Sequence, residues 1–411
     1  MIRTEEYENM IRERFDDSTF AYRSKAFRKF LYSSPRNFRE SPTTRDYVKI
    51  DEEDLIRMIG QKRVSADYAE KPRYEPDIFV RDEEVPTLSG QIVFEPLSDA
   101  IEHYPDLMAS RVFKEIGTKR MEQIINSGWT SGYFLLVEEN SENRKISIET
   151  SLHANYSSAS KSVIYLRKGA SATVTDIYRS HLSGESIQGR NIYIFLEENS
   201  RLQYNYLQEK SVGVTDICYL RSFLDRNSNL RIFHVNSGGG RVIFHTEGEL
   251  RGDHSSYEVN GVNFSAGDQK VDIGDNTFQT GKNTSSNVRV RGISRDHSTM
   301  LHRGSIDIEE SGVMSSGFYD SKILLMSREA YANSKPSLII RNSYTRSKHG
   351  SAISTIDRDE LFYLRSRGID ETSSTSMIVD GFVSWLLEKS DSDILLNHIA
   401  RLSSFSAKGE E

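Results

Sequence analysis

The sequence predicts a mainly β protein in which a long strand-rich core lies between two helical segments. Short apolar, β-branched runs recur from about residue 132 to residue 353, and no convincing amphipathic helix interrupts them. A turn of similar sequence separates several of these runs, and helix start and stop signals follow the last one. We therefore expect an N-terminal helical and irregular region at 1–127, a β core at 128–355 and a C-terminal helical domain at 356–411.

The N-terminal region is rich in proline. Seven of the eight prolines fall between residues 35 and 105, and each removes a backbone donor and interrupts regular structure. Apolar side chains recur at helical spacing in residues 22–31, and again in residues 98–126 with an interruption near Pro105. We expect short helices joined by irregular chain.

Strands in the core are predicted by a period of two. Residues 202–206 alternate apolar and polar side chains, whereas residues 192–196 are apolar throughout. A small residue recurs at the turns, as Gly169, Asn199 and Asn227, at intervals of 30 and 28 residues, and both residue types tolerate the left-handed conformation of a sharp corner. Stacked coils of a β-solenoid would show this repeat. A β-sandwich also has evenly spaced strands, so the pattern alone leaves both folds open.

Three helices are expected after the core. A capping Asp357, acidic residues in the first turn and Gly368 at the end predict the first helix. The second has an apolar face that includes Phe382, and Asp391 or Asp393 begins the third. The chain therefore ends in a small helical bundle.

Composition limits the function classes. The 411-residue chain carries a net charge of −7, which argues against a nucleic-acid binder that relies on bulk positive charge. No apolar run approaches the roughly 20 residues of a membrane span, and the first residues lack the apolar core of a signal peptide. Cys218 is the only cysteine, which excludes an intrachain disulfide and an all-cysteine metal site within one chain. We expect a soluble cytoplasmic protein that binds neither nucleic acid nor membrane.

Few patterns point to catalysis. The glycine run at 238–240 lacks the residues of a phosphate-binding loop and fits a flexible corner. Asp216 with Asp225, or Asp272 with Asp275, could supply the acid and base that β-solenoid carbohydrate enzymes use. Their spacing fits solvated loop acids equally well.

Histidine and the single cysteine are the remaining candidate metal ligands. Residues far apart in sequence can stack in adjacent coils of a solenoid, so spacing is a poor guide, and each histidine also fits a surface or hydrogen-bonded position. Cys218 lies inside an apolar run and is expected to be a small buried hydrophobe. The ten histidines are His103, His153, His181, His234, His245, His254, His297, His302, His349 and His398.

Three motifs in the C-terminal third are distinctive. Residues 324–340 combine a leucine-rich strand, a turn and a Lys-Pro-x-Leu strand; Lys348-His349-Gly350 follows; and residues 361–369 read Leu-Phe-Tyr-Leu-x-Ser-Arg-Gly-Ile. In these motifs, and more weakly upstream, the chain resembles the SufB/SufD family of iron–sulfur cluster assembly proteins. The resemblance implies a right-handed parallel β-helix core flanked by N-terminal and C-terminal helical segments.

The resemblance also implies a partner, a SufC-type ATPase that binds ATP and docks on the C-terminal helical domain. The first C-terminal helix is the expected contact, with an ordinary packed helix as the alternative. Its contact residues would be Leu361, Phe362, Tyr363, Arg365 and Arg367.

Two positions place the chain closer to SufD than to SufB, and a third departs from the pattern of many SufD-like sequences. SufB-like sequences tend to have His-Glu-Ala where this chain has His349-Gly350-Ser351, and a functional cysteine in the turn at 328–330, where this chain has none. The chain departs even from many SufD-like sequences, because the cysteine that they have two residues before the histidine is Ser347 here. We therefore expect no tightly bound cofactor in the chain alone and a transient iron or iron–sulfur cluster in the complex. His349 is the candidate interface ligand, beside thiolate and carboxylate from a SufB-like subunit.

The expected function is that of a SufD-like, non-catalytic subunit of a SufBCD-type assembly scaffold, with a SufC-type ATPase and a SufB-like subunit as partners. One alternative within the family is a SufB/D homodimer that is itself the scaffold with SufC. A more distant alternative is a β-helix carbohydrate enzyme, which predicts an acid-lined cleft along the solenoid.

Overall fold

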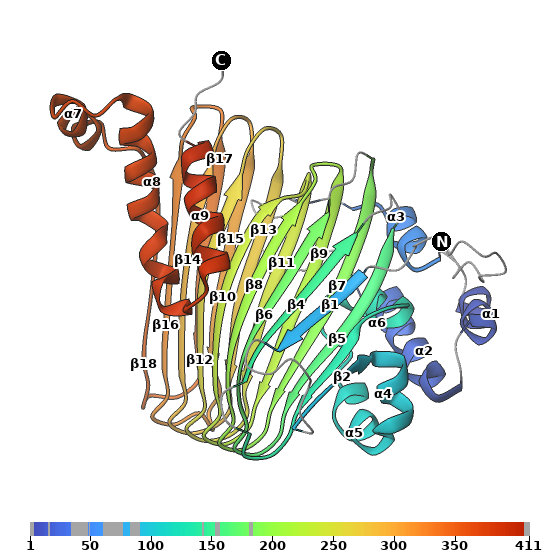
Figure 1. Ribbon diagram of the computed structural model, residues 1–411. Helices are drawn as coiled ribbons and strands as arrows, with labels where there is room; N and C mark the ends of the chain where they lie inside the picture. Colours follow the sequence, from blue (N-terminus) through green and yellow to red (C-terminus); the bar gives the residue numbers. More distant parts are fainter. Residues whose placement is uncertain are drawn as a thin grey trace.

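The computed structural model is a parallel β-solenoid of about seven turns, with helices before and after it (Figure 1). This confirms the predicted fold class and decides between the two folds that the repeat had left open. The structure describes residues 4–14, 17–33, 48, 50–60, 77–82, 91–141, 144–152, 157–180 and 184–406.

Two nine-stranded sheets form the solenoid. The first sheet contains, in spatial order, β1 (Asp77–Asp82), β4 (Arg144–Leu152), β6 (Ser171–Ser180), β8 (Arg201–Lys210), β10 (Asn229–Gly238), β12 (Ser256–Ser265), β14 (Ser285–Ser294), β16 (Ser316–Leu325) and β18 (Arg346–Thr355). The second contains β17 (Tyr331–Ile340), β15 (Thr299–Ile308), β13 (Lys270–Gln279), β11 (Arg241–Leu250), β9 (Val214–Leu224), β7 (Ser186–Leu196), β5 (Ser158–Leu166), β3 (Tyr133–Val137) and β2 (Ile92–Pro96). From β3 onward, successive strands alternate between the sheets, so each coil adds one strand to each.

Helices precede and follow the strands. The N-terminal ones are α1 (Thr4–Arg14), α2 (Asp17–Tyr32), α3 (Glu52–Gly60), α4 (Leu97–His103), α5 (Pro105–Ser110), the 3₁₀ turn η2 (Val112–Lys114) and α6 (Arg120–Gly128). The C-terminal ones are α7 (Arg358–Ser366), α8 (Glu371–Leu387), the 3₁₀ turn η3 (Glu388–Ser390) and α9 (Asp393–Ser406). The helix expected at 98–126 is divided into three, with breaks before Pro105 and after α5. The division of the chain at 127 and 355 stays a prediction.

The N-terminal end of the solenoid is closed by antiparallel strands. β1 pairs with β4, and β2 pairs with β3, whereas the later neighbours in each sheet are parallel. Neither strand was predicted, because the proline-rich sequence there indicates only short helices and irregular chain. Their regular structure comes from the free edge of the first coil, which supplies hydrogen-bond partners that local sequence does not reveal.

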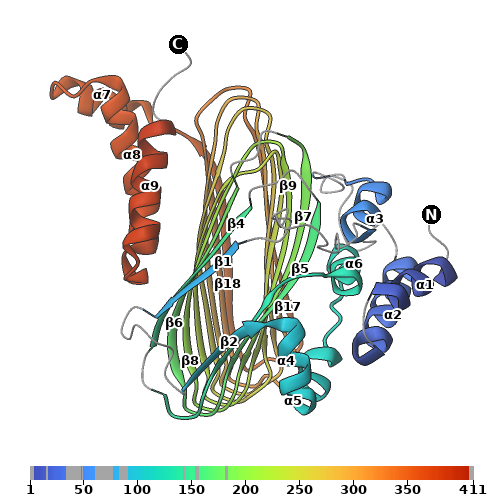
Figure 2. The same cartoon turned by 45° about the vertical axis from the view of Figure 1, so that its right-hand side comes forward.

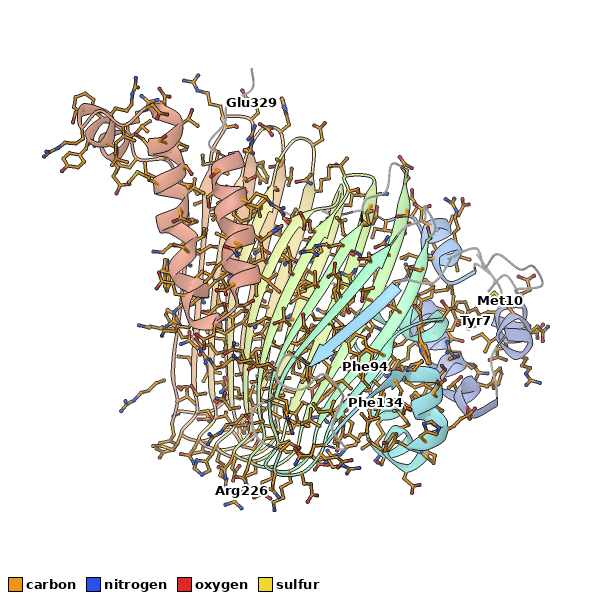
Figure 3. All side chains as sticks on the ribbon, in the orientation of Figure 1. Tyr7, Met10, Phe94, Phe134, Arg226 and Glu329 are labelled. Carbon is orange, nitrogen blue, oxygen red and sulfur yellow. The ribbon has the colours of Figure 1, made fainter. Side chains whose placement is uncertain are left out.

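The predicted corners have the predicted conformation. Gly169, Asn199 and Asn227 have φ values of 69°, 62° and 55°. The backbone N–H of Gly169 donates to Glu198 O at 3.0 Å, and that of Asn199 donates to Arg226 O at 3.0 Å. The corners therefore stack into a column, in which each left-handed residue hydrogen-bonds to the next coil. Figure 3 labels Arg226 and Glu329, which lie at the two opposite rows of corners.

The two groups of helices cover opposite faces of the solenoid (Figure 2). The apolar side chains of α3 and α6 pack on the outer face of the second sheet, as Met58 and Ile125 do against β7. Those of α8 and α9 pack on the outer face of the first sheet, where Val383 shares a buried cluster with Val262. The predicted cap of α7 is confirmed, because an Asp357 carboxylate oxygen accepts a hydrogen bond from Asp359 N at 2.8 Å.

A carboxyl group is buried inside the solenoid without a cation beside it. Asp275 of β13 is fully buried, and one of its oxygens accepts a hydrogen bond from Thr246 Oγ1 at 2.7 Å. Its other oxygen, Oδ2, has no hydrogen-bond partner among the described residues. Burial raises the pKa of Asp275 to about 7. The carboxyl group is therefore neutral over much of the acidic range in the folded chain.

Replacement of this carboxyl by an amide should change how stability depends on pH. The folded pKa of about 7 lies above the unfolded value of about 3.9, so the folded state holds the extra proton between these values and loses stability as pH rises through them. The loss is about 1.4 kcal/mol per pH unit. We expect Asp275→Asn to gain about 2 to 4 kcal/mol relative to wild type between pH 4 and pH 8, measured by urea unfolding. A constant difference across this range would contradict the assignment, and the exposed Asp268→Asn is the control, with an expected effect below about 0.5 kcal/mol.

Candidate functional site

The C-terminal end of the solenoid is open. β17 and β18 are the last strands of their sheets, and each pairs with a neighbouring strand of its own sheet on one side only. The apolar residues of this last coil stay accessible, with Tyr331 52% and Ile353 43% exposed. By contrast, Ile323, the register partner of Ile353 on β16, is fully buried. Backbone edges and apolar side chains that every other coil covers are therefore exposed here.

His349 lies on this open end. It stands opposite Tyr319 of β16 in the parallel register, and Tyr319 is buried in the interior cluster. Register partners share a face of a sheet, so His349 lies on the inner face of the solenoid wall, where no further coil among the described residues covers it. Its side chain is exposed. An imidazole in this position can offer a nitrogen to a species bound at the end of the solenoid.

Within the described part of the chain, His349 does not belong to a group of three or more side chains that could hold a metal ion. Groups of three or more histidine, cysteine, aspartate or glutamate side chains that could hold a metal do not occur among the described residues. A metal or cluster bound at His349 would need further ligands from another molecule, because such sites take about four donors.

The five residues expected to contact a partner lie on α7, which has no buried residue. Phe362 and Tyr363 are 73% and 57% exposed, and Leu361 is half-buried. The Arg365 guanidinium forms an ion pair with Glu371 at 3.1 Å, and that of Arg367 lies 5.2 Å from the centre of the Tyr363 ring. Aromatic residues and arginine are the side chains most often important in protein interfaces.

The position of α7 distinguishes it from a helix that packs into the core. Figures 1 and 2 both show it at the outer end of α8, away from the strands. Only Ile356 and Asp357 separate β18 from α7. The structure thus places the open strand and an exposed aromatic helix next to each other in the chain.

The proposed acid–base pairs are not brought together. Asp272 lies on the outer face of the second sheet, where it forms an ion pair with Arg303, whereas Asp275 points into the interior. Side chains that are three residues apart on a strand point to opposite faces of the sheet. Asp216 is buried inside the solenoid between Arg190 (2.9 Å) and Lys210 (2.7 Å), and Asp225 at a corner forms an ion pair with Arg111. Neither pair provides two carboxylates facing one cleft.

Most other histidines have structural surroundings. His234 and His302 are fully buried inside the solenoid, where burial lowers the pKa of each to about 3. They are therefore neutral hydrogen-bonding groups, and His302 Nδ1 lies 3.0 Å from Ser321 Oγ. His398 on α9 lies 2.8 Å from Ser237 Oγ and helps to hold that helix on the first sheet. His153 and His181 lie outside the described residues.

Cys218 is buried in the interior cluster, as expected of a small hydrophobe. Burial raises the pKa of its thiol to about 11, so the thiol is protonated at neutral pH. The sequence did not predict the buried ion pairs close to it, which Asp216 forms with Arg190 and Lys210. Although burial opposes ionisation, Arg190 and Lys210 hold the pKa of Asp216 below its ordinary value. These residues come from three consecutive strands of two adjacent coils, and only the period-two alternation hints that they face inward.

Comparison with known proteins agrees with this architecture. Residues 149–382 match the SufBD core domain of the SUF system for FeS cluster assembly, a span that runs from β4 into α8. An iron–sulfur cluster assembly SufBD family protein of Pyrococcus horikoshii is 26% identical over 311 residues, which cover 73% of this chain and 68% of the relative. A protein of the same description from Staphylococcus epidermidis is 21% identical over 321 residues, 76% of this chain and 68% of the relative.

The described part of the chain contains no helix long and apolar enough to cross a membrane. The matched domain covers more than half of the chain. It includes β18 with His349 and the whole of α7. The chain belongs to the SufBD family of the SUF iron–sulfur cluster assembly system.

Proposed function

We propose that the chain is a SufD-like, non-catalytic scaffold subunit that works with a SufC-type ATPase and a SufB-like subunit. The observation that carries the proposal is the open last coil, which exposes His349 and leads directly into the exposed helix α7. One end of the molecule thus offers two adjacent surfaces, a strand edge and an aromatic helix. Two different partners can use them at the same time.

The SufD-like assignment rests on thiol content. Cys218 is the only cysteine, and it is buried and protonated inside the solenoid. The turn at 328–330, where SufB-like sequences have a functional cysteine, contains none, and Ser347 stands where many SufD-like sequences have one. The chain can contribute an imidazole from His349 to iron or to a cluster under assembly, while thiolate ligands come from the SufB-like subunit.

The ATPase docks on α7 in this proposal. A short helix without a buried residue gains little stability from its own chain, so its exposed aromatic face is better explained by a partner. Movement of α7 and α8 on ATP hydrolysis would be transmitted to β18 through the two residues that join β18 to α7.

Removal of the two exposed aromatic rings should weaken ATPase binding. We expect Phe362→Ala with Tyr363→Ala to raise the dissociation constant for a purified SufC-type ATPase by about 10-fold or more, measured by isothermal titration calorimetry. The circular dichroism spectrum and melting temperature should stay unchanged, because neither ring is buried. Val212→Ala removes a comparably exposed apolar side chain far from α7 and should leave the affinity intact. Equal affinities for all three proteins would exclude α7 as the contact.

Loss of the His349 imidazole should impair cluster formation without preventing complex formation. With the ATPase and a SufB-like subunit present, we expect His349→Ala to lower cluster content by about 10-fold, read as visible absorbance and bound iron after reconstitution. The exposed His297→Ala is the control and should behave as wild type. If His349→Ala assembles the complex and forms clusters normally, the scaffold role stands and the ligand assignment is wrong.

A further inference from the structure

The interior of the first coils is apolar along one part of each strand and polar along the other. Ile192, Ile194 and Leu196 of β7 belong to the apolar cluster inside the solenoid. Side chains alternate between the two faces of a strand, so Gln188 and Arg190, near the beginning of β7, also point inward. Both are buried. Polar side chains in such positions need hydrogen-bond partners inside the solenoid.

A cavity of about 30 Å³ lies in this polar part, lined by residues of β3, β4, β5, β6 and β7 and of the chain just before β3. Thr150, Gln188 and Arg190 line it together with serines, two tyrosines and Gly132, and no described residue of the lining is an aspartate or glutamate. A cavity of this size holds one or two species of the size of a water molecule. A polyatomic anion such as sulfate does not fit.

Three buried polar atoms of the lining have no hydrogen-bond partner among the residues that the structure describes. They are Arg190 Nε, Gln188 Nε2 and Thr150 Oγ1. Buried polar groups in folded proteins are nearly always hydrogen-bonded, and one that is not destabilises the folded state. The cavity therefore calls for a species that can hydrogen-bond to all three.

The direction of the Gln188 amide is fixed by its neighbours. Its Oε1 accepts a hydrogen bond from Lys210 Nζ, which also donates to Asp216 Oδ1 at 2.7 Å. Burial lowers the pKa of Lys210 to about 8, so this amine is still protonated at neutral pH. An ammonium group only donates, and the amide oxygen must therefore face Lys210. The unpartnered atom of Gln188 is thus its nitrogen, which can only donate.

The unpartnered nitrogen of Arg190 is a donor as well, because a guanidinium group has no acceptor. Its Nη2 already donates to Tyr206 Oη at 2.7 Å and to Asp216 Oδ2 at 2.9 Å. The hydroxyl of Thr150 can also donate. Two N–H groups and a hydroxyl thus require an acceptor in the same cavity. A water molecule meets this need poorly, since it must donate two hydrogen bonds of its own, whereas an anion only accepts.

The charges around the cavity also allow an anion to bind. Arg190 and Lys210 both contact the carboxylate of Asp216, so these three side chains together carry one positive charge. Asp176 can offset that charge only while it is ionised, and burial raises its pKa to about 6. Its Oδ2 accepts hydrogen bonds from the hydroxyls of Tyr133, Tyr178 and Tyr204. At neutral and acidic pH, an anion in the cavity therefore meets neutral or positive surroundings.

We propose that this cavity is a binding site for a single monatomic anion of the size of chloride. The N–H groups of Arg190 and Gln188 and the hydroxyl of Thr150 donate to it. Thr150 on β4 and Gln188 on β7 belong to different sheets, so the bound ion joins the two walls of the first coils and stabilises them. The site lies at the opposite end of the solenoid from His349 and α7, and the inference does not depend on the proposed scaffold function.

Bromide can stand in for chloride and be located by its anomalous scattering. We expect crystals of the full chain grown in sodium bromide to show an anomalous difference peak in the cavity, within hydrogen-bonding distance of Arg190 Nε and Gln188 Nε2. Electron density at this place without an anomalous signal would identify a water molecule and overturn the proposal.

The same site can be tested in solution by its effect on stability. An ion that binds only the folded chain stabilises it, so we expect a melting temperature about 3 °C or more higher in about 0.2 M sodium chloride than in sodium gluconate of equal concentration. Gln188→Glu replaces the donor by a carboxylate and should abolish both this shift and the bromide peak.

Two further variants protect the result. Thr150→Val removes one donor at nearly constant size, so it should weaken chloride binding several-fold, and it serves as the test if Gln188→Glu does not fold. Thr175→Val is the matched control, because Thr175 points to the outer face of β6, where its Oγ1 accepts from Asn205 Nδ2 at 3.3 Å. It should respond to chloride as wild type does. An equal chloride shift in all these proteins would show a general salt effect and overturn the proposal.

Discussion

The structure depends on one constraint, that each coil of a parallel solenoid must obtain its backbone hydrogen bonds from the coils beside it. Strand ladders meet this need along the walls, and the left-handed corner residues meet it at the turns. Asn283 N donates to Val313 O at 2.9 Å, and Met314 N donates to Tyr344 O at 2.7 Å, which continues the column that includes Gly169. The first coil meets the need with antiparallel β1 and β2. The last coil has no such cover, and the candidate functional residues lie there.

Inside the solenoid, buried polar groups form hydrogen bonds that fix the register of neighbouring coils. Asp176 accepts hydrogen bonds from the hydroxyls of Tyr133 (2.5 Å), Tyr178 (3.2 Å) and Tyr204 (2.6 Å), which belong to strands of different coils. Burial raises the pKa of Asp176 to about 6, and the tyrosine donors oppose this shift. A slip of one coil by a single residue would turn these groups to the wrong face and leave the carboxyl group without partners. Such networks favour one register over the alternatives that an apolar interior would tolerate.

Strands and several corners could be predicted from the sequence, whereas contacts between coils could not. Period-two alternation identified the strands, and small residues at Gly169, Asn199 and Asn227 identified corners, because both signals are local. The corners at His254 and Met314 have the same positive φ but not the expected residue type, since stacking against neighbouring coils imposes the conformation. Contacts between coils were not predictable, because corner spacing varies and partners lie some 30 residues apart. The opposite orientations of Asp272 and Asp275 could have been deduced from their odd separation. His349 was identified by family resemblance alone, since nothing in its local spacing marks an edge.

The antiparallel cap formed by β1 and β2 also limits how large an assembly can grow. A solenoid with two bare ends could add copies at both, and such stacking would continue into a fibre. Here one end is terminated by the chain itself, so association through strand edges stops as soon as the single bare end is occupied. The cap therefore acts as a polymerisation terminator, and it restricts end-to-end association to pairs whatever the identity of the second molecule.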